Sequence, residues 1–271
     1  MSFAPPFTAA DAEPDGGALL DALRLETVDR DLYRATFVVP DDRSLYGGQV
    51  AAQALRAAGL TVEPDRLPHS LHGYFLRAGD SEHPTLFRVH RDRDGRSFSA
   101  RRVEAVQHGK VIFSMAASFH LPDDGPEVQV RPAPEVAAPE ESPAVGLPRL
   151  LSFEARAVDQ PHPDTPWPTR FWARTTAPLD DDPLLHAAVL TYLSDISSGI
   201  APLTRDGATP GASLDHALWF HHPARADAWL LTDLEPHVAG RGRGWYTGTF
   251  HDRTGRAVAS TTQECLFRAA R

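Results

Sequence analysis

Three polar residues in the second half of the chain stand out because their side chains could form one site. Asp195 follows an apolar helical stretch, Ser213 stands near the start of a predicted strand, and Gln263 lies on the inward face of another predicted strand. A buried carboxylate costs free energy unless a polar group meets it, and an inward amide must be hydrogen-bonded. We therefore predict one polar site that is centred on Asp195.

Each of these residues also has an ordinary structural explanation. Asp195 could face solvent at the C-terminal end of its helix, because a Ser-Ser-Gly run follows at 197–199. Ser213 could be a plain strand hydroxyl, and Gln263 could face a contact between subunits. Taken one at a time, the residues leave these alternatives open.

The helix that positions Asp195 is predicted over 183–198. Asp182 can cap its free N–H groups, and Pro183 at the first helical position loses no available hydrogen bond. Apolar residues then recur at steps of three and four, which predicts a buried stripe. They are Leu185, Ala188, Val189, Tyr192 and Ile196. Asp195 lies against this stripe, so burial of the stripe would carry the carboxylate inward.

The first half of the chain predicts a helix held against an antiparallel sheet. A short helix is expected at 18–25, and a strand at 33–39 ends before Pro40. Small residues over 49–58, closed by Gly59, predict a helix that packs tightly against a sheet. Further strands are predicted at 70–76, 85–90, 97–106 and 110–120, the last two joined by a turn at 107–109.

The second half repeats this order. A strand at 150–158 precedes the helix, and strands follow at 212–220, 229–234, 242–251 and 256–268. Ser70-Leu71-His72 matches Ser213-Leu214-Asp215, and Gly109-Lys110-Val111 matches Gly255-Arg256-Ala257, at nearly equal offsets. We predict a duplicated unit whose two copies join their sheets, since one copy alone would leave a sheet edge unpaired.

The predicted organisation has four parts. A loose N-terminal tail spans 1–18, an N-terminal unit spans 19–121, a Pro-rich linker spans 122–149, and a C-terminal unit spans 150–271. When the last strands of the two copies are aligned, the first copy has Ala117 at the position that Gln263 holds in the second. The first helix carries only Ala and Gly near the position that matches Asp195. We therefore expect the polar site in the C-terminal unit alone.

Several motifs, taken together and in order over about 19–268, resemble the type II acyl-CoA thioesterase family. They are Leu45-Tyr46-Gly47-Gly48-Gln49, His69-Ser70-Leu71-His72, Arg93-Asp94-Gly95-Arg96-Ser97-Phe98, Ser213-Leu214-Asp215-His216 and Ala259-Ser260-Thr261-Thr262-Gln263-Glu264. The resemblance implies an α+β double-hotdog fold, in which each long helix is wrapped by its antiparallel sheet. It also implies hydrolysis of fatty acyl-CoA to free acid and CoA.

The family's catalytic set falls on Asp195, Ser213 and Gln263, with Ser where the family has Thr or Ser. A thioester carbonyl is electrophilic, so a positioned water can attack it without a protein nucleophile. The resulting hypothesis is that Asp195 takes the proton of that water while Ser213 and Gln263 orient it. Oxyanion donors are expected among backbone N–H groups beside a helix start. No cofactor is expected, and a homodimer or homotetramer is expected by resemblance only.

Composition excludes several other classes. The 271 residues carry a formal net charge of −9, which argues against a nucleic-acid-binding surface. No apolar run is long enough to predict a membrane span, and the N-terminus lacks the blocks of a signal peptide, so a cytoplasmic location is expected. The single cysteine, Cys265, is expected to be a packing residue. The histidines show no metal-ligand spacing, and no metal site is expected.

Positive charge for the CoA phosphates could come from several arginines, which solvated strand edges explain equally well. They are Arg91, Arg93, Arg96, Arg101, Arg102, Arg241 and Arg243.

Two other functions remain open. Asp181-Asp182-Pro183-Leu184-Leu185-His186 faintly resembles the site of hotdog enoyl-CoA hydratases, although the Asn of that motif is missing. A second alternative is an acyl-CoA-binding protein without turnover.

Overall fold

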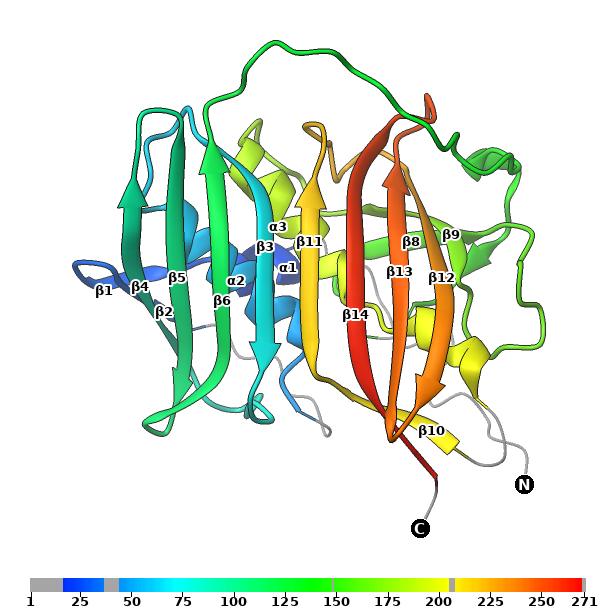
Figure 1. Ribbon diagram of the computed structural model, residues 1–271, viewed down its shortest axis with the longest axis horizontal. Coiled ribbons are helices and arrows are strands. Elements are labelled where there is room, and N and C mark those ends of the chain that lie inside the picture. Colours follow the sequence, from blue (N-terminus) through cyan, green and yellow to red (C-terminus); the bar gives the residue numbers. More distant parts are fainter. Residues whose placement is uncertain (1–16, 37–43, 148, 205–207, 270–271) are drawn as a thin grey trace.

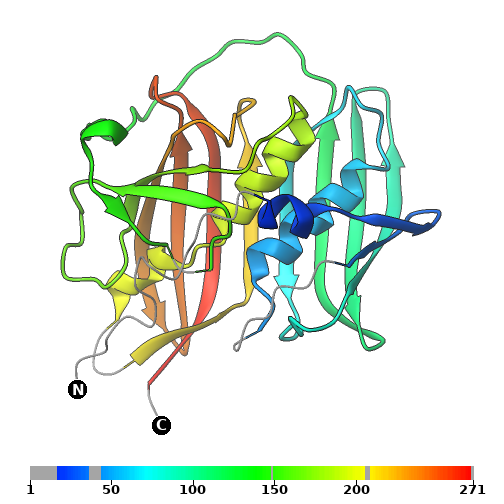
Figure 2. The ribbon, with the colours of Figure 1, turned by 180° about the vertical axis from the view of Figure 1, so that it is seen from behind.

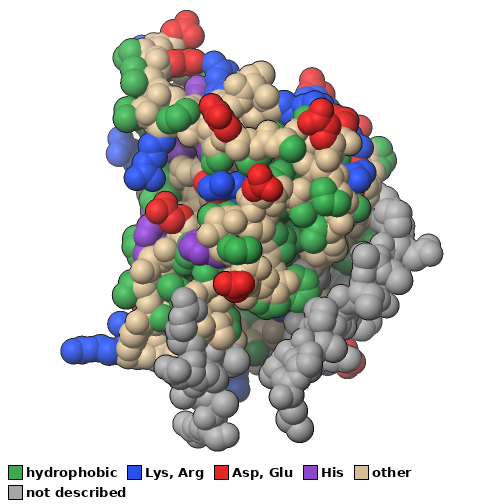
Figure 3. All heavy atoms as spheres, turned by 90° about the vertical axis from the view of Figure 1, so that its right-hand side faces the viewer, with side chains coloured by type: hydrophobic (Ala, Val, Ile, Leu, Met, Phe, Trp, Pro, Cys, Tyr) green, Lys and Arg blue, Asp and Glu red, His purple; other side chains and the backbone are tan. Residues whose placement is uncertain are grey.

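The structure, a computed structural model, describes residues 17–36, 44–147, 149–204 and 208–269. Over these residues the chain forms one large antiparallel sheet that curves around two long helices (Figures 1 and 2). The helices are α1 (Ala18–Leu23), α2 (Gly47–Gly59) and α3 (Pro183–Ser194), with 3-10 turns η1 (Pro139–Glu141) and η2 (Ser198–Leu203). Charges of both signs are interspersed on the face seen in Figure 3.

The strands of the first half are β1 (Glu26–Asp29), β2 (Leu32–Ala35), β3 (Leu67–Phe75), β4 (Thr85–Asp94), β5 (Phe98–Gln107) and β6 (Lys110–His120). Those of the second half are β7 (Ala144–Val145), β8 (Phe153–Ala157), β9 (Arg170–Thr175), β10 (Ala208–Ser213), β11 (Asp215–Phe220), β12 (Leu230–Gly240), β13 (Arg243–His251) and β14 (Ala257–Ala269).

The two halves meet at the middle of the sheet, where β3 pairs with β11. The strand order is β1-β2-β4-β5-β6-β3-β11-β14-β13-β12-β9-β8-β7, and β10 pairs with β14. Leu71 and Leu218 lie opposite each other in this junction, and both are fully buried. Strands β3 and β11 are the edge strands of the two halves, so their pairing leaves neither of these edges unpaired.

Helix α3 begins as its sequence predicts. The Asp182 side chain accepts a hydrogen bond of 2.9 Å from the Leu184 N–H, and Pro183 occupies the first turn. All five residues of the predicted stripe are buried. The predicted end at 198 is wrong, because the helix stops at Ser194 and Asp195 is its C-cap residue. The carboxylate thus leaves from the end of a helix, not from its side.

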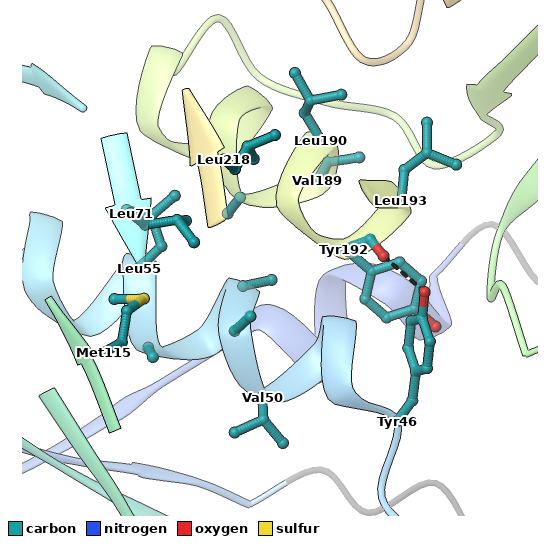
Figure 4. Packing of buried hydrophobic residues seen from close by; sticks show 14 of the residues in the cluster. Tyr46, Val50, Leu55, Leu71, Met115, Val189, Leu190, Tyr192, Leu193 and Leu218 are labelled. Carbon is teal, nitrogen blue, oxygen red and sulfur yellow. Dashed lines mark hydrogen bonds between the residues drawn. The ribbon is translucent and has the colours of Figure 1, made fainter. Parts of the chain in front are cut away.

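Helices α2 and α3 cross at close range beneath the sheet. Tyr46 donates a hydrogen bond of 3.0 Å to the Tyr192 carbonyl, and the two rings pack edge to face with centroids 5.0 Å apart (Figure 4). A Cβ on Gly48 would lie 2.5 Å from that same carbonyl oxygen. Glycine is therefore needed at position 48 for the helices to approach this closely.

Several details of the predicted elements are wrong. Strands β1, β7 and β9 were not expected, and the single strand predicted at 212–220 is divided into β10 and β11 at Leu214. The predicted linker contains η1 and β7, and β7 pairs with β8. Residues 1–16 of the predicted tail and 37–39 of the first predicted strand lie outside the described residues.

The described residues contain one helical stretch, Pro183–Leu203, that is apolar and long enough to cross a membrane by composition alone. It runs along the interior of the sheet, and 78% of its most apolar 18-residue segment is buried inside the molecule. Packing against α2 and the sheet accounts for its apolar character.

Candidate active site

Asp195 is almost fully buried, with 4% of its surface exposed, so the alternative of a solvent-facing residue is wrong. Removal from water raises the pKa of its carboxyl group above the ordinary value. The nearby His216, the amide of Gln263 and the Ser213 hydroxyl act in the opposite direction and favour the carboxylate. The site therefore holds a desolvated acid that remains in contact with hydrogen-bond donors.

Gln263 lies on the inner face of β14 and is fully buried. Its Nε2 atom is 2.8 Å from Asp195 Oδ1 and 2.6 Å from Ser213 Oγ. The amide thus joins the end of α3 to the end of β10 within one chain. The alternative that Gln263 faces a subunit contact is wrong.

Ser213 is half-buried at the last position of β10. Its hydroxyl lies 3.4 Å from Asp195 Oδ1 and can donate to that oxygen while it accepts from Gln263. The structure therefore brings all three predicted residues together.

Two further polar residues belong to this cluster and were not predicted. Ser197 Oγ lies 3.1 Å from Gln263 Nε2. His216 Nδ1 lies 2.6 Å from Gln263 Oε1, and its ring is buried on the inner face of β11. The alternation of β11 around the buried Leu218 places His216 on the inner face, so the sequence held a signal for His216. No such signal marks Ser197, which follows the helix end.

A cavity of about 750 Å³ opens beside this cluster. Asp195, Ser197 and Ser213 line it, whereas Gln263 is not among its lining residues. Gln263 thus lies behind these three residues, and its Nε2 is within hydrogen-bonding distance of each of them. The expectation that Gln263 orients a water directly is not supported by this arrangement.

The cavity is built from both halves of the chain. Its apolar wall takes residues from both, among them Val50, Phe75 and Phe113 of the first half and Trp167, Ile196 and Leu266 of the second. The start of α2 also faces the carboxylate, because a Cβ on Gly47 would lie 2.5 Å from Asp195 Oδ2. The polar cluster belongs to the second half, and the apolar wall is shared by both halves.

Cys265 is fully buried beside this cluster, with its Sγ 3.8 Å from Gln263 Nε2. Burial raises the pKa of its thiol to about 12, so the thiol stays protonated at neutral pH. This agrees with the predicted packing role.

None of the seven arginines singled out in the sequence lines the cavity. Arg101 has 1% of its surface exposed and pairs with Asp94 at 2.6 Å, so its selection as a phosphate ligand is wrong. Arg91, Arg102 and Arg243 each pair with a carboxylate. Among the described residues, the arginines that line the cavity are Arg77 and Arg149.

The residues of the enoyl-CoA hydratase alternative have structural partners. Asp182 caps α3 and pairs with Arg56 at 3.0 Å. His186 is buried and its Nδ1 accepts the Ala226 N–H at 3.1 Å, while burial lowers the pKa of its ring. Neither residue lines the cavity. This arrangement does not provide the acid and base pair that hydration of a double bond needs.

Histidine spacing along the sequence missed one spatial cluster. Asp80, His83 and His108 bring their ligand-type atoms within 4.8 Å of one another at the surface. His83 Nδ1 lies 2.8 Å from an Asp80 carboxylate oxygen, which an ordinary surface ion pair explains. The turn at 107–109 folds back onto the loop after β3, and no sequence spacing indicates this contact.

The sheet wrapped around two long helices, with an acid, an amide and a hydroxyl beside a cavity of about 750 Å³, defines a double-hotdog protein with a candidate hydrolytic site. A solved hot dog protein from Alicyclobacillus acidocaldarius, at 21% identity and a TM-score of 0.79, shares this fold over 94% of the chain and 99% of its own length. The double-hotdog architecture expected from the sequence is confirmed.

Comparison with known proteins identifies the family. Residues 39–120 match the family described as the acyl-CoA thioesterase N-terminal domain, and 122–267 match the C-terminal domain. Acyl-coenzyme A thioesterase 8 of Rattus norvegicus is 37% identical, covering 91% of this chain and 88% of the relative. Acyl-CoA thioesterase 2 of Haemophilus influenzae is 34% identical, covering 92% and 96%.

A solved structure agrees with these matches. The acyl-CoA thioesterase II TesB2 of Mycobacterium marinum is 41% identical with a TM-score of 0.79, over 93% of this chain and 98% of that one. The chain belongs to the acyl-CoA thioesterase family, which confirms the resemblance seen in its motifs. It is therefore a thioester hydrolase.

Proposed function

We propose that this chain hydrolyses fatty acyl-CoA to free acid and CoA by direct attack of a water molecule that Asp195 activates. The observation that carries the proposal is the contact of Asp195 with Ser213 and Gln263 at the wall of a large apolar cavity. The acyl chain occupies the apolar part of this cavity, and the thioester carbonyl lies beside the carboxylate.

Asp195 acts as the general base. Burial raises the pKa of its carboxyl group, which makes the carboxylate a stronger base than a solvated aspartate. It takes one proton from the water as the oxygen attacks the carbonyl carbon. The tetrahedral intermediate then collapses, the carbon–sulfur bond breaks, and the proton passes to the departing thiolate.

Ser213 and Gln263 have different roles in this proposal. The Ser213 hydroxyl lines the cavity and holds the water beside Asp195. Gln263 stays behind them and is a positioning residue, because its amide N–H groups point to Asp195 and Ser213. Correct orientation of the reacting groups is worth several orders of magnitude in rate.

The N-terminus of α2 supplies the donors for the oxyanion. The first N–H groups of a helix have no partner within it, and the helix dipole favours negative charge there. Tyr46, the N-cap residue, makes no side-chain cap bond, and Gly47 lines the cavity next to Asp195. We therefore assign the backbone N–H of Gly47 to the oxyanion.

The exposed Arg77 lines the same cavity and is the arginine that we assign to the CoA phosphates. It is held by a hydrogen bond of 2.6 Å from its guanidinium to the Val111 carbonyl. A guanidinium in this position suits bidentate phosphate binding.

The outer face of the sheet suits association of two copies. Tyr74, Trp219 and Trp245 have 64%, 37% and 39% of their surfaces exposed there, although they are large and apolar. Burial of such a face would stabilise a homodimer or homotetramer. Sedimentation equilibrium tests this expectation, and a monomer at all concentrations would contradict it. A cytoplasmic location also stays a prediction.

The direct test of the proposed mechanism is Asp195→Asn. The variant keeps the size of the side chain but loses the base, so kcat for thiol release from acyl-CoA should fall by about 10²–10⁴-fold. Asp182→Asn is the matched control at the other end of α3, because asparagine caps helices as well as aspartate does. It should keep its activity.

Full turnover in a folded Asp195→Asn variant would remove Asp195 from the mechanism. A series of acyl-CoA substrates without any thiol release by the unmodified chain would favour the binding-protein alternative.

A further inference from the structure

The polar cluster contains one ring for which the proposed mechanism has no role. His216 lies on β11, is 1% exposed, and contacts two polar side chains. Its Nδ1 is 2.6 Å from Gln263 Oε1, and its Nε2 is 2.8 Å from Ser194 Oγ. A buried histidine that is bonded at both nitrogens is held in one orientation.

The contacts of Gln263 decide which of its amide atoms faces Asp195. An amide oxygen placed 2.8 Å from the Asp195 carboxylate oxygen would set two acceptors against each other. The amide nitrogen must therefore face Asp195 whenever that group is ionised, which leaves the amide oxygen facing His216. At 2.6 Å, this oxygen needs a donor, so the ring must carry a hydrogen on Nδ1.

Ser194 makes this arrangement independent of the charge on the ring. The Ser194 hydroxyl lies 2.9 Å from the Thr191 carbonyl and 2.8 Å from His216 Nε2. If it donates to Thr191, the ring donates from both nitrogens and is charged. If it donates to Nε2, the ring is neutral with its hydrogen on Nδ1. Both forms keep the Nδ1–H directed at Gln263.

We propose that His216 is a positioning residue for hydrolysis: its Nδ1–H fixes the Gln263 amide so that the amide N–H groups hold Asp195 and Ser213 in their reactive places. This inference rests on the proposed function. It extends the catalytic arrangement to a chain of contacts, from Ser194 through His216 and Gln263 to Asp195.

The charges around His216 are few. Burial lowers the pKa of its ring, and Asp195, the hydrogen bond with Gln263 and Asp215 act in the opposite direction. In return, His216 lowers the pKa of Asp195. The other titratable groups near Asp195 are Tyr46, Tyr246, Cys265 and Arg149. Loss of a charged ring would thus raise the pKa of Asp195 and move the acid limb of kcat/KM to higher pH, whereas loss of a neutral ring would leave the limb in place.

Two amide variants separate the role of Nδ1 from a merely structural role of the ring. The amide nitrogen of asparagine can take the place of Nδ1, whereas the longer glutamine places its amide nitrogen near Nε2. His216→Asn should keep kcat within about fivefold of the unmodified chain, and His216→Gln should lose about 10- to 100-fold in kcat with little change in KM.

His221→Asn is the matched control. His221 Nε2 also bonds a β14 side chain, Ser260 Oγ at 2.8 Å, but this contact lies away from the cavity. Its activity and pH profile should stay unchanged, with thermal midpoints recorded for every variant.

Equal kcat in the folded His216→Asn and His216→Gln variants would overturn the inference. Failure of the proposed function is separate, because it would appear as retained turnover in Asp195→Asn. If His216→Gln does not fold, His216→Asn alone decides, since loss of its activity in a folded protein contradicts the role assigned to Nδ1–H.

Discussion

Asp195 combines two opposing influences at the scale of the single residue. Desolvation favours the neutral acid, while Gln263, Ser213 and His216 favour the carboxylate. The result is a base that is stronger than a solvated aspartate and is held in place by a buried amide. Burial of this group costs stability, which is common where a site serves function.

The raised pKa of Asp195 gives a pH prediction. The acid limb of kcat/KM should lie above 3.8, the ordinary aspartate value, because the carboxylate is the active form. The folded state binds the proton more tightly than the unfolded state does, so this group stabilises the fold at low pH. That contribution is lost as pH rises from 3.8 through the raised pKa.

Asp195→Asn should remove this contribution and be at least as stable as the unmodified chain at neutral pH. Denaturant midpoints of the two proteins, measured on both sides of this pH window, provide the check. An acid limb at or below 3.8, or a less stable variant at neutral pH, would contradict the raised pKa.

The sequence could predict part of this site and not the rest. Asp195 and Gln263 were found because a carboxylate beside an apolar stripe and an amide on an inward strand face both break the local pattern. Ser213 required the family resemblance, since a strand hydroxyl is common. His216 was missed although strand alternation places it inward, and the back-to-back placement of Gln263 depends on three-dimensional contacts that spacing does not reveal.

At the scale of elements, the start of α2 and the end of α3 form the site together. Gly47 has no room for a side chain, because a Cβ there would lie 2.5 Å from Asp195 Oδ2 and 2.8 Å from the Phe75 ring. The glycine that opens one helix thus sets the space available to the carboxylate that closes the other.

Gly47→Ala should therefore displace the carboxylate. A displacement of about 1 Å can cost about 10²-fold in rate, so we expect kcat for thiol release to fall by about 10- to 100-fold. Gly59→Ala is the matched control at the other end of α2, where a Cβ would meet the end of the flexible Leu184 side chain at 2.4 Å. It should cost about 1–3 kcal/mol of stability and leave kcat intact. Equal activity of the two variants would contradict this role of Gly47.

The elements most visible in the sequence were those with strong local signals. The cap formed by Asp182 and the hairpin around 107–109 are where the pattern predicts them. Strand β9 was missed because three of its consecutive residues are buried, so it shows no alternation. Strands β1 and β7 are short and owe their place to pairing with neighbours, which local pattern does not encode.

At the scale of the whole molecule, the two halves act as one body. Their sheets join at β3 and β11, their helices cross, and the cavity takes its polar cluster from the second half and its apolar wall from both. The division of the chain into four parts stays a prediction about folding units. Both halves therefore contribute residues to the site.

Leu218→Ala tests how strongly the halves depend on each other. The side chain is fully buried at the junction opposite Leu71, so its truncation should cost about 2–5 kcal/mol. If the halves unfold together, hydrogen exchange should speed up in the strands of both. Faster exchange confined to the second half would show that the halves unfold separately.

Direct attack by water is tested most directly by following the oxygen atom that enters the product acid. Enzyme in excess over acyl-CoA is allowed one turnover in ¹⁸O-labelled water, and the reaction is then quenched. The masses of the free acid and of the protein are measured by mass spectrometry. Direct attack by the water that Asp195 activates predicts that the free acid carries one labelled oxygen and that the protein is unchanged. An acylated protein, or label retained in the Asp195 carboxylate, would contradict it.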